Sequence, residues 1–363
     1  MYSNDDKIII WLMTFDFMSY KKAKFVIDNF DDLLDFHDNI KAYSIKLKSE
    51  FSSNEINTMI NDSNLYNVDR LISNYIKAGI DIVTIKSDKY PPLLKEIDSP
   101  PVILYCRGDV SLLKMDCLGV VGTRRATRYG KDVGAKFVKD IATENIVIVS
   151  GLAEGIDTVA HKSTLEVNGK TIAVLGGGIN NIYPNSNITL ANNIVEKGGL
   201  LVSEYKPNEP ALTYHFPVRN RIIAGLSKGV FIVEATEKSG SMHTKNYALD
   251  YNREVFALPA RVGDIYSVGC NKCIKSGQAT MVLSSDDIIS YFGGNKKLEE
   301  NKSIIQLNYE EQLIYDCVLG HEKHFEEISK ETNIETKNLV TMLIRMELKG
   351  IITKLPGNYY KVN

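Results

Sequence analysis

The chain has 363 residues, a length that predicts about two or three domains. Apolar residues make up 44% and charged residues 24%, and Gly and Pro together are just under a tenth, which excludes a collagen-like repeat and a wholly disordered chain. The net charge of −2 excludes a polycation that coats nucleic acids or membranes, so any nucleic-acid site has to be a local patch.

The cysteines and the N-terminal residues bear on the compartment. The five cysteines are Cys106, Cys117, Cys270, Cys273 and Cys317, an odd number spread over a long chain. The early apolar run at residues 8–13 is too short for a signal peptide or a membrane span. We therefore expect a reduced, cytoplasmic protein with no membrane partner.

Residues 1–75 are predicted to form a small accessory domain of short helices, like the SAM or helix-hairpin-helix modules. Apolar residues recur at helical spacing between Ala23 and Phe36. The segment holds 8 Lys and Arg against 12 Asp and Glu, a net charge of −4.

Residues 85–108 are predicted to be a connector. They contain the pairs Pro91-Pro92 and Pro100-Pro101, the second followed by an apolar run at residues 102–105. Paired prolines stop helices and favour extended backbone.

Residues 76–295 are predicted to form an α/β core with an extended Rossmann-like, doubly wound and mostly parallel sheet. Short apolar runs alternate with segments long enough for a helix; the runs are residues 118–121, 146–149, 171–175, 200–202, 229–234, 254–258 and 280–283. Continuous apolar runs are typical of strands buried on both faces, and helices between them demand parallel pairing. Residues 76–300 hold 27 basic against 24 acidic residues, so an anionic ligand is expected here first.

A polar linker at residues 293–297 leads to residues 305–363, which are predicted to form a winged helix. Three helix-like stretches precede a terminal hairpin, at residues 310–319, 325–332 and 335–349. In the third stretch Leu339, Leu343 and Met346 are predicted to be buried, with Lys337, Thr341 and Arg345 exposed. Because residues 301–363 carry a net charge of −1, major-groove binding is not indicated and a protein contact is at least as well supported.

Two strand ends carry the residues of a phosphate site. Gly122-Thr123-Arg124-Arg125 ends the first core strand, and Ser239-Gly240-Ser241 opens a later helix with Lys245 in its first turns. Glycine allows close backbone approach, the following helix N-terminus supplies free N–H groups, and the basic side chains add full charge. We predict phosphate binding at both, against the alternative of tight turns with solvated side chains.

The segment His215-Phe216-Pro217-Val218-Arg219-Asn220-Arg221 is the densest polar cluster. Phe216 offers a face for base stacking, and Arg219, Asn220 and Arg221 offer donors to a DNA backbone. A core phenylalanine beside two structural, ion-paired arginines explains the cluster equally well.

Dinucleotide, serine-hydrolase and zinc chemistry each lack a required residue. The turn Gly176-Gly177-Gly178 has Asn181 where the third fingerprint glycine would stand. Ser150-Gly151 ends the second strand without a ribose-binding acid, and Ile148 removes the first glycine of a nucleophile elbow. Cys270 and Cys273 have no second ligand pair, so they are predicted to be incidental thiols.

Three further side chains, two acidic and one histidine, are considered both as catalytic groups and as structural ones. Asp157 and His161 are predicted to make buried polar contacts at a capped helix rather than to catalyse. Glu234 fits either a general base or, more commonly, a buried acid paired with an arginine.

Taken together, these motifs resemble the DNA-processing protein A family, also called DprA or Smf. The resemblance covers residues 85–290. It is carried by Gly122-Thr123-Arg124-Arg125 with Tyr129-Gly130, Ser150-Gly151-Leu152-Ala153-Glu154-Gly155-Ile156-Asp157 with Ala160-His161, Tyr183-Pro184, Ser203-Glu204-Tyr205, Phe216-Pro217 with Arg219-Asn220-Arg221, and Ser239-Gly240-Ser241.

The resemblance implies a bacterial protein that binds single-stranded DNA without sequence preference, forms a homodimer and loads RecA recombinase during natural transformation. It implies no enzymatic activity, no cofactor and no metal. The DNA pocket would comprise the Gly122–Arg125 turn, Ser150-Gly151, the Phe216–Arg221 cluster and the turn at residues 239–241. The sequence departs from the family pattern at Met242, Lys245, Asn252, Pro259-Ala260 and Gln278.

Two other functions remain open. The core also resembles nucleotide phosphoribohydrolases, in which Glu234 or Glu237 would act on a nucleoside monophosphate, although their Pro-Gly-Gly-x-Gly-Thr turn is absent. A sensor whose winged helix reports nucleotide or DNA binding to another protein is the third reading.

Overall fold

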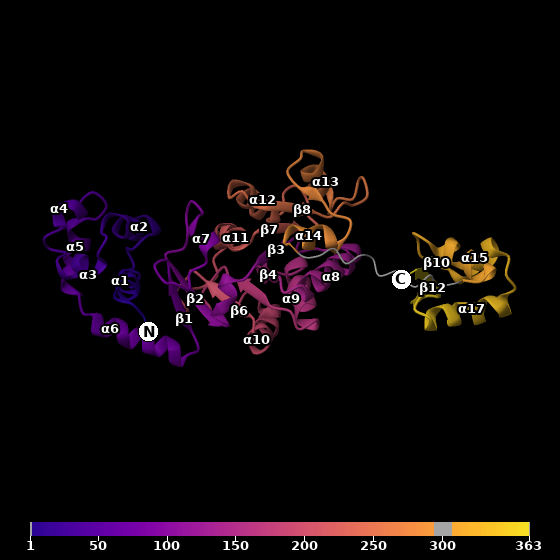
Figure 1. The fold of residues 1–363 in the computed structure, drawn as a ribbon, viewed down its shortest axis with the longest axis horizontal. Coiled ribbons are helices and arrows are strands. Elements are labelled where there is room, and N and C mark those ends of the chain that lie inside the picture. Colours follow the sequence, from indigo (N-terminus) through magenta and orange to yellow (C-terminus); the bar gives the residue numbers. More distant parts are fainter. Residues whose placement is uncertain (1, 294–306, 363) are drawn as a thin grey trace. The chain divides into compact units, whose positions relative to one another are not determined.

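The computed structural model describes residues 2–293 and 307–362 (Figure 1). The chain divides into two compact units, residues 1–296 and 297–363, and each is treated by itself. The linker predicted at residues 293–297 lies, apart from Gly293, outside the described residues.

The N-terminal part of the first unit is helical, as predicted. Its helices are α1 (Asn4–Leu12), α2 (Tyr20–Asn29), α3 (Leu33–Asp38), α4 (Ser44–Leu47), α5 (Ser53–Asn61) and α6 (Leu65–Lys77). Ser3 and Ser52 form capping boxes at α1 and α5, which satisfy N–H groups that a helix start leaves free. The buried side chains of Leu12, Leu33 and Phe36 pack the interior. The likeness to a particular helical module stays a prediction.

The described residues of the core form one nine-stranded sheet in the order β1-β2-β6-β5-β4-β3-β7-β8-β9. The strands are β1 (Asp81–Thr84), β2 (Ile103–Gly108), β3 (Cys117–Val121), β4 (Val147–Ser150), β5 (Thr171–Val174), β6 (Leu200–Ser203), β7 (Gly229–Ile232), β8 (Glu254–Ala257) and β9 (Thr280–Met281). Strands β3 to β9 pair in parallel, so the predicted doubly wound α/β class is confirmed.

The connector predicted at residues 85–108 is wrong in part, because it contains an interior strand. β2 pairs antiparallel with both β1 and β6. Pro92 opens the short helix α7 (Pro92–Lys95), a position where the missing N–H is tolerated. The apolar run after Pro101 was therefore the signal of a buried strand.

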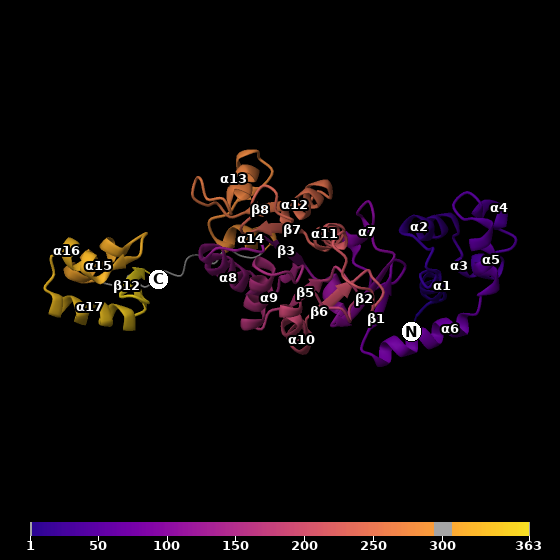
Figure 2. The same ribbon diagram turned by 180° about the vertical axis from the view of Figure 1, so that it is seen from behind.

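Helices cover both faces of the sheet (Figures 1 and 2). On one face α8 (Arg128–Thr143), α9 (Ile156–Glu166) and α14 (Ser285–Tyr291) pack against alternate strand residues such as Leu118 and Val120. On the other, α11 (His215–Leu226), α12 (Ser241–Asp250) and α13 (Val268–Lys275) pack near Val121 and Ile232. α10 (Ile188–Glu196) completes the helices of the core. This winding brings the strand-to-helix turns to one edge of the sheet.

The second unit has the predicted winged-helix elements. They are α15 (Tyr309–Val318), β10 (Lys323–His324), α16 (Phe325–Thr332), α17 (Thr336–Leu348), β11 (Ile352–Leu355) and β12 (Tyr359–Val362), with the sheet order β10-β12-β11. Leu339, Leu343 and Met346 are buried, whereas Lys337, Thr341 and Arg345 are exposed, as predicted. In the described parts of both units, none of the helices is long and apolar enough to cross a membrane.

Candidate nucleic-acid interface

A cavity of about 650 Å³, here called the carboxyl-edge pocket, opens where the strands of the core end. Three segments far apart in the sequence supply most of its wall: the turn after β3, the first half of α11 and the start of α12. Ten predicted site residues line it, namely Gly122, Thr123, Arg124, Arg125, Phe216, Arg219, Asn220, Ser239, Gly240 and Ser241. The sequence therefore predicted the main walls of the pocket.

The turn after β3 is held by backbone contacts that only glycine permits. The N–H of Thr123 donates to the carbonyl oxygen of Glu234 at 2.7 Å, and its hydroxyl accepts from the N–H of Arg125 at 3.1 Å. A Cβ on Gly122 would lie 2.5 Å from a side-chain carbon of Ile156. The close packing fixes the turn and directs Arg124 and Arg125 outward, where both are exposed.

Arg124 is the cation nearest the aromatic wall of the pocket. Its guanidinium lies 5.8 Å from the ring centroid of half-buried Phe216, within cation–π range. Tyr183 also lies beside that ring, with centroids 5.5 Å apart. In the described part of the chain, no carboxylate forms an ion pair with Arg124 or Arg125. Their charge is thus available to a ligand.

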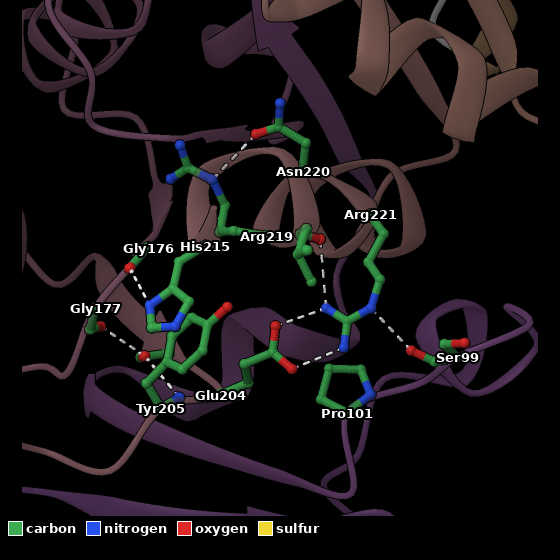
Figure 3. Close-up of polar contacts among 12 residues, drawn as sticks. Ser99, Pro101, Gly176, Gly177, Glu204, Tyr205, His215, Arg219, Asn220 and Arg221 are labelled. Atoms are coloured by element: carbon green, nitrogen blue, oxygen red, sulfur yellow. Dashed lines mark hydrogen bonds and ion pairs between the residues drawn. The ribbon is translucent and has the colours of Figure 1, made fainter. Parts of the chain in front are cut away.

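Arg219 is buried and mainly holds the backbone below the pocket in place through hydrogen bonds. Its Nη1 donates to the carbonyl oxygens of Gly151, at 2.7 Å, and Val174, and its Nε donates to the side-chain oxygen of Asn220 at 3.1 Å (Figure 3). A Cβ on Gly151 would collide with this guanidinium, which explains the glycine. Burial lowers the pKa of Arg219 to about 10, and the Asp157 carboxylate opposes that shift. The guanidinium still lines the pocket and adds positive potential there.

Asp157 and His161 make the buried polar contacts predicted for them. The Asp157 carboxylate accepts from the N–H groups of Gly151 and Ala153 at 3.1 and 3.3 Å. Burial raises its pKa, against the charge of Arg219. His161 lies 2.7 Å from the hydroxyl of Thr171. Both side chains shape the turn after β4.

Arg221 is placed away from the pocket, although it is only two residues from Arg219. Its Nη atoms donate to both carboxylate oxygens of Glu204 at 2.6 and 2.7 Å, and its Nε donates to the carbonyl oxygen of Ser99 (Figure 3). Its side chain is 9% exposed. The structure thus gives Arg221 the ion-paired role that the sequence left as an alternative.

Ser150 and Lys245 also fall outside the carboxyl-edge pocket. The Ser150 hydroxyl is buried and donates to the carbonyl oxygen of Val120 at 2.6 Å. Lys245 lines a different cavity. Gly151 lines a small side cavity of about 70 Å³ together with Arg124, Phe216 and other residues.

The start of α12 supplies hydroxyl groups to the pocket. The hydroxyls of Ser239 and Ser241 lie 2.8 Å apart. Thr244 is 1% exposed and lines the pocket, and its Oγ1 has no hydrogen-bond partner among the described residues. An unpartnered buried hydroxyl beside a helix N-terminus is suited to an anionic oxygen.

The site predicted from the sequence leaves out several lining residues, among them Tyr183, Thr244 and Tyr266. Spacing gave a signal for Thr244, which lies one turn after Gly240 on α12. Tyr183 follows the glycine turn at residues 176–178, and an aromatic side chain beside such a turn indicates a place in the wall of a ligand pocket. No local pattern marks Tyr266, which the fold brings in from the loop before α13.

The carboxylates proposed for the enzymatic reading do not line the pocket. Glu234 is 1% exposed and accepts from the N–H and hydroxyl of Thr127 at 2.8 and 2.7 Å, so it fixes the start of α8. Its partner is thus a helix start, not an arginine. Glu237 pairs with Lys272.

The two close cysteines show no zinc centre. Cys270 and Cys273 are buried free thiols on α13. Among the described residues, no group of three or more His, Cys, Asp and Glu side chains is arranged to hold a metal ion.

Comparison with known proteins identifies the family. The family model described as DNA recombination-mediator protein A matches residues 81–293, which includes every residue of the carboxyl-edge pocket. The chain belongs to this family. The DNA processing protein DprA of Bacillus subtilis is 44% identical over 220 residues, which are 60% of this chain and 73% of that protein.

Two solved structures are similar as well. The DNA processing protein A of Streptococcus pneumoniae matches with a TM-score of 0.60 and 33% identity, covering 78% of this chain and 97% of that one. That of Helicobacter pylori, described for its single-stranded DNA binding mode, matches with a TM-score of 0.53 and 32% identity, covering 58% and 95%.

Proposed function

We propose that this protein binds single-stranded DNA without sequence preference in the carboxyl-edge pocket. The observation that carries the proposal is the placement of two arginines without carboxylate partners, Arg124 and Arg125, beside half-buried Phe216 and the N-terminus of α12. A single strand presents backbone phosphates to the arginines and the helix N-terminus, and unstacked bases to Phe216. The related Helicobacter pylori protein binds single-stranded DNA, which supports the same ligand here.

Each wall of the pocket has a role in this binding. Phosphate oxygens would accept from the backbone of the Gly122 turn, from the hydroxyls of Ser239 and Ser241, and from Arg124. Phe216 would stack one base, a contact that every base can make. Arg219 would contribute its charge while it holds the turn after β4 in place. These contacts read phosphate and ring face, so they do not discriminate sequence.

The test is fluorescence anisotropy of a labelled oligo-dT at two salt concentrations, with duplex DNA and AMP as competitors. We expect tight, salt-sensitive binding that duplex and AMP displace poorly. Arg124→Ala should weaken binding to all sequences alike, because it contacts phosphate. Arg128→Ala is the matched control, since Arg128 is exposed on the first turn of α8 and pairs with Asp132 outside the pocket.

Two results would decide against the proposal. Full-strength binding by Arg124→Ala would remove the pocket from the interaction. Displacement or cleavage of AMP without oligonucleotide binding would support the phosphoribohydrolase reading instead, and Glu234→Gln would then have to abolish the cleavage.

We further propose that the protein is a cytoplasmic homodimer that loads RecA onto the bound strand, and that it is not an enzyme. The family description as a recombination mediator supports this role. Two pockets on one dimer would raise the affinity for a long strand by avidity. The rate of RecA assembly on single-stranded DNA should rise with the wild type and not with Arg124→Ala. An equal rise with both proteins would contradict the proposal.

A further inference from the structure

A second cavity lies on the other side of α12 from the carboxyl-edge pocket. Its volume is about 630 Å³, and α12, α13 and the residues after α13 supply its wall. We call it the lysine pocket, because it is lined by Lys245, Lys272 and Lys275 together with Met242, Asn246 and Gln278, among others. Nothing in the proposed function uses it.

Lys245 is the buried charge of this pocket. The residue is only 7% exposed, and its Nζ donates to the amide oxygen of Gln278 at 2.9 Å. Within residues 2–293 and 307–362, no carboxylate forms an ion pair with it. Its charge also acts on the neighbouring Cys273 thiol, whose pKa burial raises and Lys245 lowers. A buried ammonium is costly unless an anion compensates it.

The rim of the lysine pocket is also cationic. Lys272 pairs with Glu237, which leaves Lys245 and Lys275 in excess of the acidic lining. An amide, Asn246, stands beside them. Two uncompensated ammonium groups and an amide donor around an open cavity fit a phosphate group.

The helix α12 links the two cavities. Ser241 and Thr244 line the carboxyl-edge pocket, whereas Met242 and Lys245 line the lysine pocket. Ser241 and Lys245 are separated by one turn, roughly 6 Å along the axis at about 1.5 Å per residue. A strand whose phosphate sits at the start of α12 therefore has the next turn of the helix within reach.

We propose that the lysine pocket binds a phosphodiester of the single strand that continues beyond the carboxyl-edge pocket, with Lys245 as its central ligand. The inference rests on the proposed function and extends it to a second phosphate site. This binding needs no sequence readout, because an ammonium recognises a phosphate as a point charge.

The experiment compares oligo-dT of about 4 and about 20 nucleotides binding to the full-length wild type and to Lys245→Met. Methionine keeps the buried aliphatic chain and removes the charge. We expect unchanged affinity for the short strand and weaker binding of the long one. The slope of log affinity against log salt should become less steep by about 0.7, the value for one phosphate on a single strand.

Two further variants guard against a folding effect. Gln278→Glu keeps Lys245 but sets a carboxylate against its Nζ, and it should reproduce the loss for the long strand. Lys197→Met is the matched control, because the Lys197 Nζ likewise donates to a neutral group, the carbonyl oxygen of Leu165, at the C-terminal end of α10. It should leave both affinities and the salt slope unchanged.

The possible results distinguish a failure of this inference from a failure of the proposed function. Arg124→Ala with undiminished binding of both strands overturns the proposed function. Weakened binding by Arg124→Ala, with an unchanged salt slope in Lys245→Met and Gln278→Glu, overturns only the second site. Pyrophosphate that binds the wild type and not Lys245→Met, without any effect of strand length, would assign the pocket to a free phosphate and also overturn the inference.

Discussion

The Rossmann-like core and the winged helix place their charges differently. The core buries Asp157, Arg219 and Lys245 around its cavities and Arg221 against Glu204. The winged helix keeps Lys337 and Arg345 exposed on α17. On the same helix Val340, Ile344 and Leu348 are exposed at a spacing of four residues, which forms an apolar stripe.

The difference indicates which unit is built to hold an anion. Buried charges are fixed by neighbours, so their field is oriented before a ligand arrives. The exposed Lys337 and Arg345 are solvated and screened by salt, whereas Arg124, although also exposed, is placed against the ring of Phe216 at the carboxyl-edge pocket. The position of a unit's charges therefore indicates DNA binding better than a fold that is known from DNA-binding proteins.

The largest effect is expected at the buried ion pair of the core. Arg221→Ala leaves the Glu204 carboxylate without its partner, so the free energy of unfolding should fall by about 3–5 kcal/mol. Chemical denaturation followed by circular dichroism measures this. Oligo-dT affinity at a temperature where the variant is folded should equal that of the wild type, because Arg221 lies outside the carboxyl-edge pocket.

Arg345→Ala on α17 is the counterpart in the winged helix. The exposed Arg345 should change the unfolding free energy by less than about 0.5 kcal/mol. A loss of DNA affinity in folded Arg221→Ala would return Arg221 to the DNA site that the sequence suggested.

The next effect concerns the aromatic wall. Phe216→Ala should weaken oligo-dT binding by roughly 5- to 150-fold, since stacking on one aromatic is worth about 1–3 kcal/mol per base. Anisotropy titration measures the change. Tyr309→Ala in the winged helix, where Tyr309 is 79% exposed, should leave the affinity unchanged. Equal losses in the two variants would show that the units share the strand.

The sequence predicted the strands and helices of the core well, because buried parallel strands form continuous apolar runs. It missed β1, and it missed β2 because two prolines stand just before that strand. Residues that line the carboxyl-edge pocket were predicted where a short motif alone fixes the geometry, as at Gly122 and at Ser239.

Side-chain direction was harder to predict from the sequence. The segment from His215 to Arg221 was treated as one cluster, but it begins a helix, in which residues two apart differ by about 200° in direction. Arg219 therefore reaches the pocket and Arg221 the opposite side. Lys245, one residue after Thr244, faces another cavity for the same reason.

Acidification should destabilise the core before the winged helix. Thr171 donates its hydroxyl proton to the carbonyl oxygen of Ile148, so the Nδ1–H of His161 donates to Thr171 and Nε2 is unprotonated. Burial lowers the pKa of His161 to about 3, and the charge of Arg219 acts in the same direction. Because the folded pKa lies below the ordinary histidine value of 6.5, this stabilisation is present above pH 6.5 and is lost as the pH falls towards 3.

Between pH 6.5 and 5 the loss from His161 amounts to about 2 kcal/mol, at about 1.36 kcal/mol per pH unit. Asp157, whose pKa is raised by burial, acts in the opposite direction as it takes up a proton. The difference between wild type and His161→Gln in urea unfolding therefore isolates the histidine, and the variant should show the flatter pH dependence. In the winged helix, the hydrogen bond from Lys349 lowers the pKa of Glu311 below the ordinary value for a glutamate. That unit should hold its stability down to about pH 5, and a parallel loss in both units would contradict the assignment to His161.

The smallest effect is expected on α17. Replacing both Lys337 and Arg345 with Gln should change oligo-dT affinity by less than about twofold and leave the salt slope unchanged. If each residue bound a phosphate of a single strand, the slope would become less steep by about 1.4, at about 0.7 per contact. Anisotropy at several salt concentrations distinguishes these results. An unchanged slope would leave the apolar stripe of α17 to a protein contact, whereas a flatter slope would make the winged helix a second DNA-binding unit despite its exposed charges.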